Sequence, residues 1–327
     1  MTKSTRYFLL GSATVLTVGL CTGLVAYYAG LPTGAFSGTD THGDLAYVPA
    51  DATMVAVADV QAVMQSPLRQ HLKPSVSSKE RGAERLLEET GINIETDIDR
   101  VTICALARPD AGPKGGDGFA VIRGRFDDGR LEGLARAKGA QFEEYRGKRL
   151  VKTTAREGQG PVLAFVEPGT LLVGSESAVK WAMDQKASGH NVVQNGDMMR
   201  LLTGISGDAW AVGRADALKR SGQELPNGLP VQMPAIEWFA ASGELSNGLA
   251  GSLRAEAKDE EAARNLREVV QGFVAMGRLQ SGQHGDMQAL MDTVQMGGSG
   301  KTVTLGFSVP AALIEKMLSK HEIAAEQ

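Results

Sequence analysis

The sequence predicts an α+β protein in which one transmembrane helix precedes two divergent copies of a single folded unit. Each unit is expected to run strand, helix, β-hairpin, helix, β-hairpin, helix. Because hairpins are joined to helices, we expect mainly antiparallel sheets with helices on one face. Two observations support this fold class: an uncharged apolar run at 7–31, and the similar order of strand-like and helix-like segments in 46–205 and 206–320.

The apolar run reads YFLLGSATVLTVGLCTGLVAYYAGL and contains no charged residue. As a helix it would be about 37 Å long, enough to cross a hydrocarbon core of about 30 Å. Lys3 and Arg6 precede it, so the positive-inside rule places residues 1–6 in the cytoplasm and the chain after the run outside. A cleaved signal peptide is the alternative, but such peptides have apolar cores of about 7–15 residues. We therefore expect an uncleaved anchor at 7–31.

Composition limits the classes of partner. Of the 327 residues, 43% are hydrophobic and 22% are charged, which is ordinary for a globular protein. The formal net charge is −4, and two of the cations, Lys3 and Arg6, belong to the cytoplasmic tail. An acidic exterior argues against a nucleic-acid partner. Cys21 lies in the apolar run and Cys104 in a strand-like segment, so we expect no disulfide and a buried Cys104.

The first unit follows a Gly/Ser/Thr-rich segment, residues 32–45, which is typical of a flexible tether. Short apolar runs rich in β-branched residues predict strands, and 3.6-residue spacing after a polar cap predicts helices. In order, we expect a strand at 52–58, a helix at 60–65 capped by Asp59, strands at 99–107 and 119–125, a helix capped by Asp127, hairpin turns at 146–148 and 168–169, and a helix at 175–185.

The second unit repeats this order in 206–320 and leaves a short tail at 321–327. We expect a strand at 208–215, a hairpin of strands at 236–243 and 249–257, a helix at 259–279, a strand at 302–308 and a helix from Pro310. The helix at 259–279 has a stripe of Leu266, Val269, Val270 and Phe273 at spacings of three and four residues. Such a stripe predicts that all four side chains are buried against the hairpin.

Two motifs suggest catalysis. Gly297–Thr302 (GGSGKT) is similar to a phosphate-binding loop, but Gln295 stands where the motif needs its first glycine, and a strand-like segment follows instead of a helix. We interpret it as a hairpin turn. Ser177 and Lys180 match the S-x-x-K signature of serine acylating enzymes, although its partner motifs are missing. A serine hydrolase or acyltransferase using Ser177 and Lys180 therefore stays as an alternative.

The remaining polar residues predict no catalytic, metal or cofactor site. The five histidines are scattered without the spacing of metal ligands. The acidic pairs at 127–128 and 259–260 stand at helix starts, where carboxylates cap the helix dipole.

Three stretches resemble a family of uncharacterised bacterial membrane-anchored proteins. They are YVPADATMVAVADVQAVMQSPLRQHL from Tyr47, ETGINIETDIDRVTICA from Glu89, and the segment from SGELSNGLAGSLRAEAKDEEAARNL to GKTVTLGFSVPA. The resemblance covers most of residues 45–315. It implies a single anchor, a duplicated α+β exterior and a location in the cell envelope, and it implies no activity, cofactor or site residue.

Together these patterns predict a non-catalytic, membrane-anchored protein whose exterior acts as an interaction, scaffolding or sensing module. Its expected partners are the membrane, through residues 7–31, and a protein of the envelope. Besides the hydrolase, a carrier of a lipid or another apolar ligand is an alternative, and it would require an enclosed cavity between sheet and helices.

Overall fold

A computed structural model describes residues 42–67, 69, 87–106, 117–155, 158–203, 205–215, 235–245, 248–281 and 285–314. Within those ranges, none of the helices combines the length and the hydropathy that crossing a bilayer requires. The expected anchor at 7–31 and the expected tail at 321–327 lie outside them.

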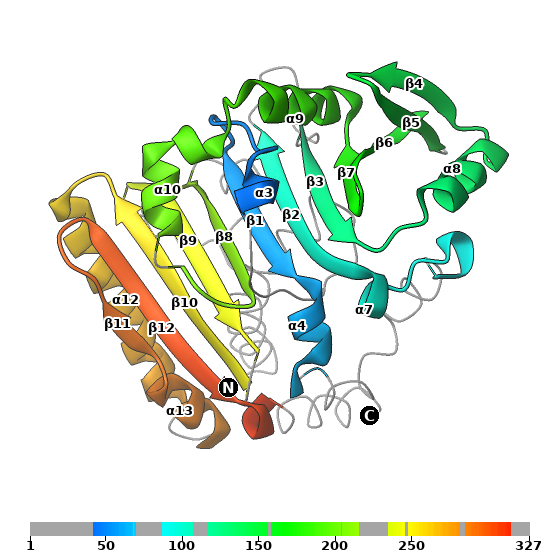
Figure 1. Cartoon of the computed structure of the whole chain (residues 1–327). Helices are drawn as coiled ribbons and strands as arrows, with labels where there is room; N and C mark the ends of the chain where they lie inside the picture. The colour runs from blue at the N-terminus through cyan, green and yellow to red at the C-terminus, as the bar shows by residue number, and fades with distance from the viewer. Residues whose placement is uncertain are drawn as a thin grey trace.

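The architecture is mixed α+β, built on one antiparallel sheet of twelve strands (Figure 1). The strands follow the order β11-β12-β10-β9-β8-β1-β2-β3-β7-β6-β5-β4. Their bounds are β1 Met54–Asp59, β2 Ile98–Leu106, β3 Asp117–Gly124, β4 Gln141–Tyr145, β5 Lys148–Ala155, β6 Gly158–Glu167, β7 Thr170–Gly174, β8 Ala209–Arg214, β9 Ile236–Glu244, β10 Gly248–Ala257, β11 Gln295–Gly297 and β12 Thr302–Pro310. The antiparallel α+β prediction is therefore confirmed, but the strands form one sheet. β1 pairs with β8, which joins the two expected units.

The helices lie before, between or after these strands along the chain. Their bounds are α3 His42–Leu45, α4 Val60–Gln65, α7 Ile94–Asp97, α8 Asp128–Ala137, α9 Glu176–Ser188, the 3₁₀ helix η3 Val192–Gln194, α10 Gly196–Leu202, α12 Glu260–Ser281 and α13 Gly285–Asp292. Residues 311–314 are also helical, as expected after Pro310.

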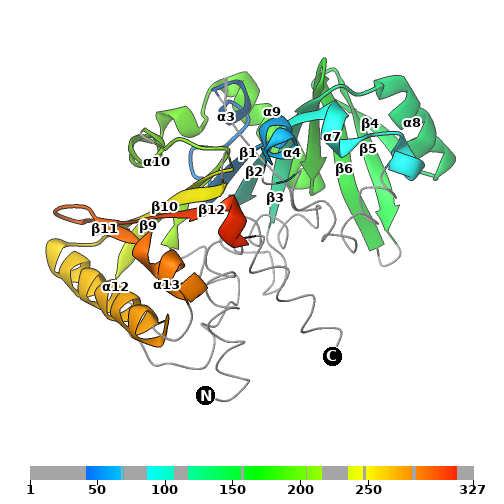
Figure 2. The same cartoon turned by 90° about the horizontal axis from the view of Figure 1, so that it is seen from below.

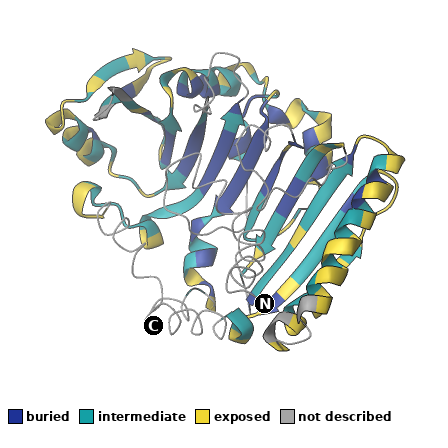
Figure 3. Ribbon diagram, turned by 180° about the vertical axis from the view of Figure 1, so that it is seen from behind, coloured by how far each residue is buried: buried dark blue, intermediate teal, exposed yellow. Residues whose placement is uncertain are grey.

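Helices lie on both faces of the sheet, so the prediction that they share one face is wrong (Figure 2). The largest core packs α3, α9 and α10 on one face, and α4, α7 and α12 lie on the other. Strand β1 shows the physical reason. Val55 and Val57 face the first side, Ala56 and Ala58 face the second, and all four are buried. In Figure 3 the strands at the centre of the sheet are coloured mostly as buried. A strand that is apolar on both faces needs cover on both.

Local signals placed the helix starts correctly. The side chain of Asp59 accepts a hydrogen bond from the Ala62 amide, Asp127 accepts one from Arg130, and Ser175 accepts one from Ala178. These N-caps satisfy amides that lack a partner in the first helical turn. The expected hairpin turn at Arg146-Gly147 joins β4 to β5, with both residues at positive φ.

The stripe on α12 is only partly covered, which corrects the prediction for Phe273. The side chains of α12 that pack on the sheet end at Val270. Leu266 is 4% exposed, whereas Phe273 is 45% exposed. The periodicity is helical as predicted, but the helix continues for three more turns after its contact with β10 and β12 fades, and there it meets α13.

Candidate functional site

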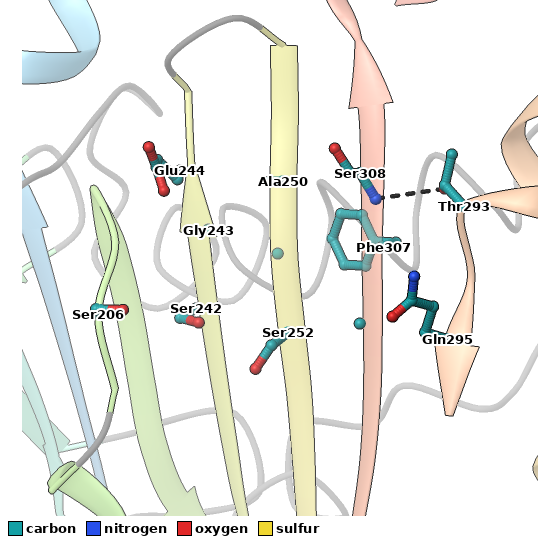
Figure 4. Close-up of a pocket in the computed structure, with 12 residues that line it drawn as sticks. Ser206, Ser242, Gly243, Glu244, Ala250, Ser252, Thr293, Gln295, Phe307 and Ser308 are labelled. Atoms are coloured by element: carbon teal, nitrogen blue, oxygen red, sulfur yellow. Dashed lines mark hydrogen bonds between the residues drawn. The ribbon is translucent and has the colours of Figure 1, made fainter. Parts of the chain in front are cut away.

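An open groove of about 320 Å³ lies on the face of the sheet that carries α10, over β9, β10, β12 and β11 (Figure 4). Its volume is that of a small ligand site. Most of the side chains around it are short and polar. The lining residues are Ser206, Ser242, Gly243, Glu244, Ala250, Gly251, Ser252, Thr293, Gln295, Gly306, Phe307 and Ser308.

Strand register creates this groove. Ser252 of β10 stands opposite Ser242 of β9 and opposite Gly306 of β12, so all three positions point to the same face. Gln295 of β11 stands opposite Gly306 and forms the far wall. Because Gly306 has no side chain, the sheet is hollow between Ser252 and Gln295.

The groove offers hydrogen-bonding groups and one carboxylate, that of Glu244, and its lining contains no histidine, lysine or cysteine. Thr293 supports the rim, since its hydroxyl accepts a hydrogen bond from the Ser308 amide at 3.3 Å. This set of groups can bind a polar partner.

Ser177 and Lys180 lie on α9, far from this groove in the strand order, and their side chains engage other groups. The Ser177 hydroxyl is exposed and lies 3.3 Å from that of Ser175. The Lys180 ammonium donates to Glu143 and to Glu176, each at 2.7 Å.

Lys180 belongs to a ring of four charges that fastens α9 to the β4–β5 hairpin. Lys152 completes the ring, with its Nζ 2.5 Å from Glu143 and 2.8 Å from Glu176. The hydrogen bond to Glu143 and then that to Glu176 raise the pKa of Lys180 to about 12. Hydrogen bonds from Lys152 and Lys180 lower the pKa of Glu143 to about 2. A general base needs a pKa near the working pH, so this geometry does not support Lys180 as a base for Ser177.

A buried ion cluster at Asp44 was missed by sequence reasoning. Asp44 on α3 is fully buried, and its carboxylate accepts hydrogen bonds from Arg123 and, at 3.4 Å, from Arg100. Thr102 donates to the same carboxylate at 3.3 Å. Residues 42–45 are therefore part of the fold, and the prediction of a flexible tether up to residue 45 is wrong for them. The sequence of this segment does not indicate that Asp44 is buried, because its two arginine partners are more than fifty residues away.

Further charged and polar groups interact with one another next to Asp44. Burial, the charge of Glu167 and a hydrogen bond to Glu167 raise the pKa of Tyr47 well above its usual value. Lys186 lies 4.9 Å from the centre of the Tyr47 ring and pairs with Glu167 at 3.4 Å. The first residues of the folded part are thus held to the sheet and to α9 by charge as well as by packing.

The other predicted features have clear positions. The segment Gly297–Thr302 connects β11 to β12 as the predicted hairpin turn, with Gly298 and Gly300 at positive φ. Cys104 is buried, as expected. Over the described ranges, no three His, Cys, Asp or Glu side chains come together as metal ligands.

Comparisons with known proteins add little. No family model and no curated protein matches the chain, so the resemblance through YVPADA stays a prediction. Among solved structures, the chain is similar to the one titled "Structure of crystal form I of TP0453", with 11% identity and a TM-score of 0.47. That match covers 84% of this chain and 96% of the other. At this level of similarity it carries no inference about function.

Proposed function

We propose that the protein is a non-catalytic, membrane-anchored module outside the cytoplasm that binds a polar partner in the groove over β9, β10, β12 and β11. The carrying observation is the groove itself, in which Ser242, Ser252 and Gln295 surround a hollow above Gly306. Interaction, scaffolding or sensing all fit such a site. A protein of the envelope is the proposed partner.

The position of Asp44 sets how close the folded part lies to the proposed anchor. The apolar run ends at residue 31, and Asp44 is tied to β2 and β3 only a dozen residues later. A folded part attached so soon after a membrane segment stays close to the membrane. The ion cluster also fixes the direction in which the chain enters the fold.

The order of strands supports the duplication that the sequence predicts. In the first half, β3 lies between β2 and β7, and in the second half β10 lies between β9 and β12. In each half a helix, α8 or α12, follows the third strand. β1 and β8 pair antiparallel at the centre, with Ala56 opposite Ala211. We infer two copies of one unit that differ at the outer edges of the sheet. The first copy has three further strands beyond β7, and the second has one beyond β12.

The two alternatives have less support. The charge ring holds Lys180 protonated, which argues against the hydrolase. An apolar carrier needs an enclosed apolar cavity, whereas the groove is open and lined with hydroxyl groups.

Site-specific photo-cross-linking in cells tests the proposal. A benzophenone amino acid at Ser252 should yield one discrete adduct with an envelope protein. The same residue at Lys148, exposed on the distant β4–β5 hairpin, should yield none.

A groove-filling variant sharpens this test. A Cβ at Gly306 would meet backbone atoms only at 4.0 Å, so the Cβ of Gly306→Leu has room, and the rest of its side chain extends into the groove. Gly306→Leu should abolish the Ser252 adduct while the unfolding midpoint stays unchanged. The same adducts from both positions, or no adduct from Ser252, would refute the proposed binding site.

A further inference from the structure

The second half of α12 exposes a cluster of large apolar side chains. Phe273 is 45% exposed, Met276 is 43% exposed and Leu279 is 83% exposed. Elsewhere in the described ranges, the large hydrophobic residues with comparable exposure are Leu87 and Val193, which stand singly. Single exposed apolar residues are ordinary, but a cluster on one element indicates a contact surface.

Helix geometry explains how this flank arises. Three residues advance about 300° around an α-helix, so each step from Phe273 to Met276 to Leu279 turns about 60° further from the line of Leu266. Leu266 and Ala263 face the sheet, while Gly277 faces Met291 of α13. The sheet and α13 thus cover one side of the helix. Phe273 lies about 20° from the line of Leu266 but beyond the end of the sheet contact, and Met276 and Leu279 turn further away, so the three exposed residues form one flank.

The charges of α12 are distributed unevenly along its length. Its glutamates, Glu260, Glu261 and Glu268, all lie in the first half, whereas residues 269–281 contain Arg278 as their sole charged residue. Helices that lie in the interface of a bilayer carry Lys or Arg on the polar face and Phe or Leu on the other, and an apolar flank beside Arg278 fits this pattern.

The chain before α3 is short, which keeps the folded part near the proposed anchor. Residues 32–41 separate the predicted anchor from His42, and ten residues span at most about 36 Å. A segment of this length keeps α3, and with it the folded part, within about 36 Å of the proposed anchor.

We propose that Phe273, Met276 and Leu279 dock into the boundary between headgroups and acyl chains of the membrane that holds residues 7–31. This inference rests on the proposed anchor and adds a second contact with the same bilayer. The domain would then lie on the membrane with α12 against it, which leaves the groove on the opposite face of the sheet free for a partner.

Fluorescence in proteoliposomes tests this orientation. The full chain with Cys21→Ser carries one remaining cysteine, Cys104, which is buried. Leu279→Cys in this background is labelled with nitrobenzoxadiazole and reconstituted into phosphatidylcholine vesicles, with or without nitroxide on the acyl chains. Glu268→Cys, which is exposed on the first half of α12, is the matched control.

We expect the label at 279 to emit at shorter wavelength and to be quenched by acyl-chain nitroxide several-fold more than the label at 268. Equal quenching at the two positions overturns the inference. A second outcome also overturns it: the label at 279 emits at short wavelength, lipid nitroxide does not quench it, and the effect grows with protein density. That result would show that a second copy of the protein covers the flank.

A carbonate wash of the same vesicles separates this inference from the proposed function. Protein that is retained while its label at 279 stays unquenched overturns the docking of α12 alone. Protein that is released overturns the anchor, and with it the proposed function.

Discussion

At the scale of residues, the burial of Asp44 is what attaches the start of the fold to the sheet. Its carboxylate balances two arginines from neighbouring strands, Arg100 and Arg123. Removing one partner of a buried ion pair leaves an uncompensated charge, which costs about 3–5 kcal/mol. Asp44→Ala should therefore lower the free energy of unfolding by about that amount, measured by urea denaturation of the full chain in detergent. Asp197→Ala, which breaks an exposed pair with Arg200, should change it by less than about 1 kcal/mol. Equal effects would show that Asp44 is not buried.

The charge ring on α9 predicts a pH dependence with a definite sign. The pKa of Glu143 is lowered to about 2, so its contribution is present above the ordinary value of 4.5 and is lost as the pH falls towards 2. The pKa of Lys180 is raised to about 12, so its contribution is present below 10.5 and is lost as the pH rises through 12. Hydrogen-exchange protection of the α9 amides should therefore fall between pH 5 and pH 2 more in the natural protein than in Glu143→Gln. The same fall in both would rule out the ring as the fastening of α9.

At the scale of elements, α12 separates a covered half from an uncovered half. Leu266→Ala removes a buried side chain and should lower the free energy of unfolding by about 2–5 kcal/mol. Phe273→Ala removes a half-exposed ring and should lower it by about 1 kcal/mol or less. Urea midpoints of the two variants in detergent decide this. A larger loss of unfolding free energy for Phe273→Ala than for Leu266→Ala would mean that Phe273 is buried, as the sequence alone predicts.

The outcome for α12 shows what can and cannot be predicted for an element. Local patterns predicted most of the strands and the helix caps at Asp59 and Asp127, because neighbouring residues decide these features. The apolar stripe correctly predicted a helix. It could not predict where the covering surface ends, because that depends on how β10 pairs with β12, Thr302–Pro310, a strand that follows the helix much later in the chain.

At the scale of the whole molecule, one sheet joins both halves through β1 and β8. Trp181 on α9 reports on the first half, and Trp238 on β9 reports on the second. Variants in which Trp210 is replaced and only one of these two tryptophans is kept should show the same urea midpoint, because a continuous sheet unfolds cooperatively. Two separate midpoints would mean that the halves are independent domains.

Long-range pairing also explains why the groove could not be predicted from the sequence. Ser242, Ser252, Gln295 and Gly306 carry no motif, and only strand register brings them to one face. The same holds for Asp44 and its arginines. Sequence patterns instead drew attention to Ser177 and Lys180, whose side chains the fold commits to other partners.

The central claim is that this folded part lies outside the cytoplasm and is held there by residues 7–31. Labelling of Ser252→Cys in a Cys21→Ser background tests it directly, because Ser252 is exposed and Cys104 is buried. A maleimide that does not cross membranes is applied to spheroplasts before and after lysis, and the labelled protein is then washed with carbonate. We predict equal labelling before and after lysis, with the protein retained in the membrane. Labelling that requires lysis, or release of the protein by carbonate, would contradict the claim.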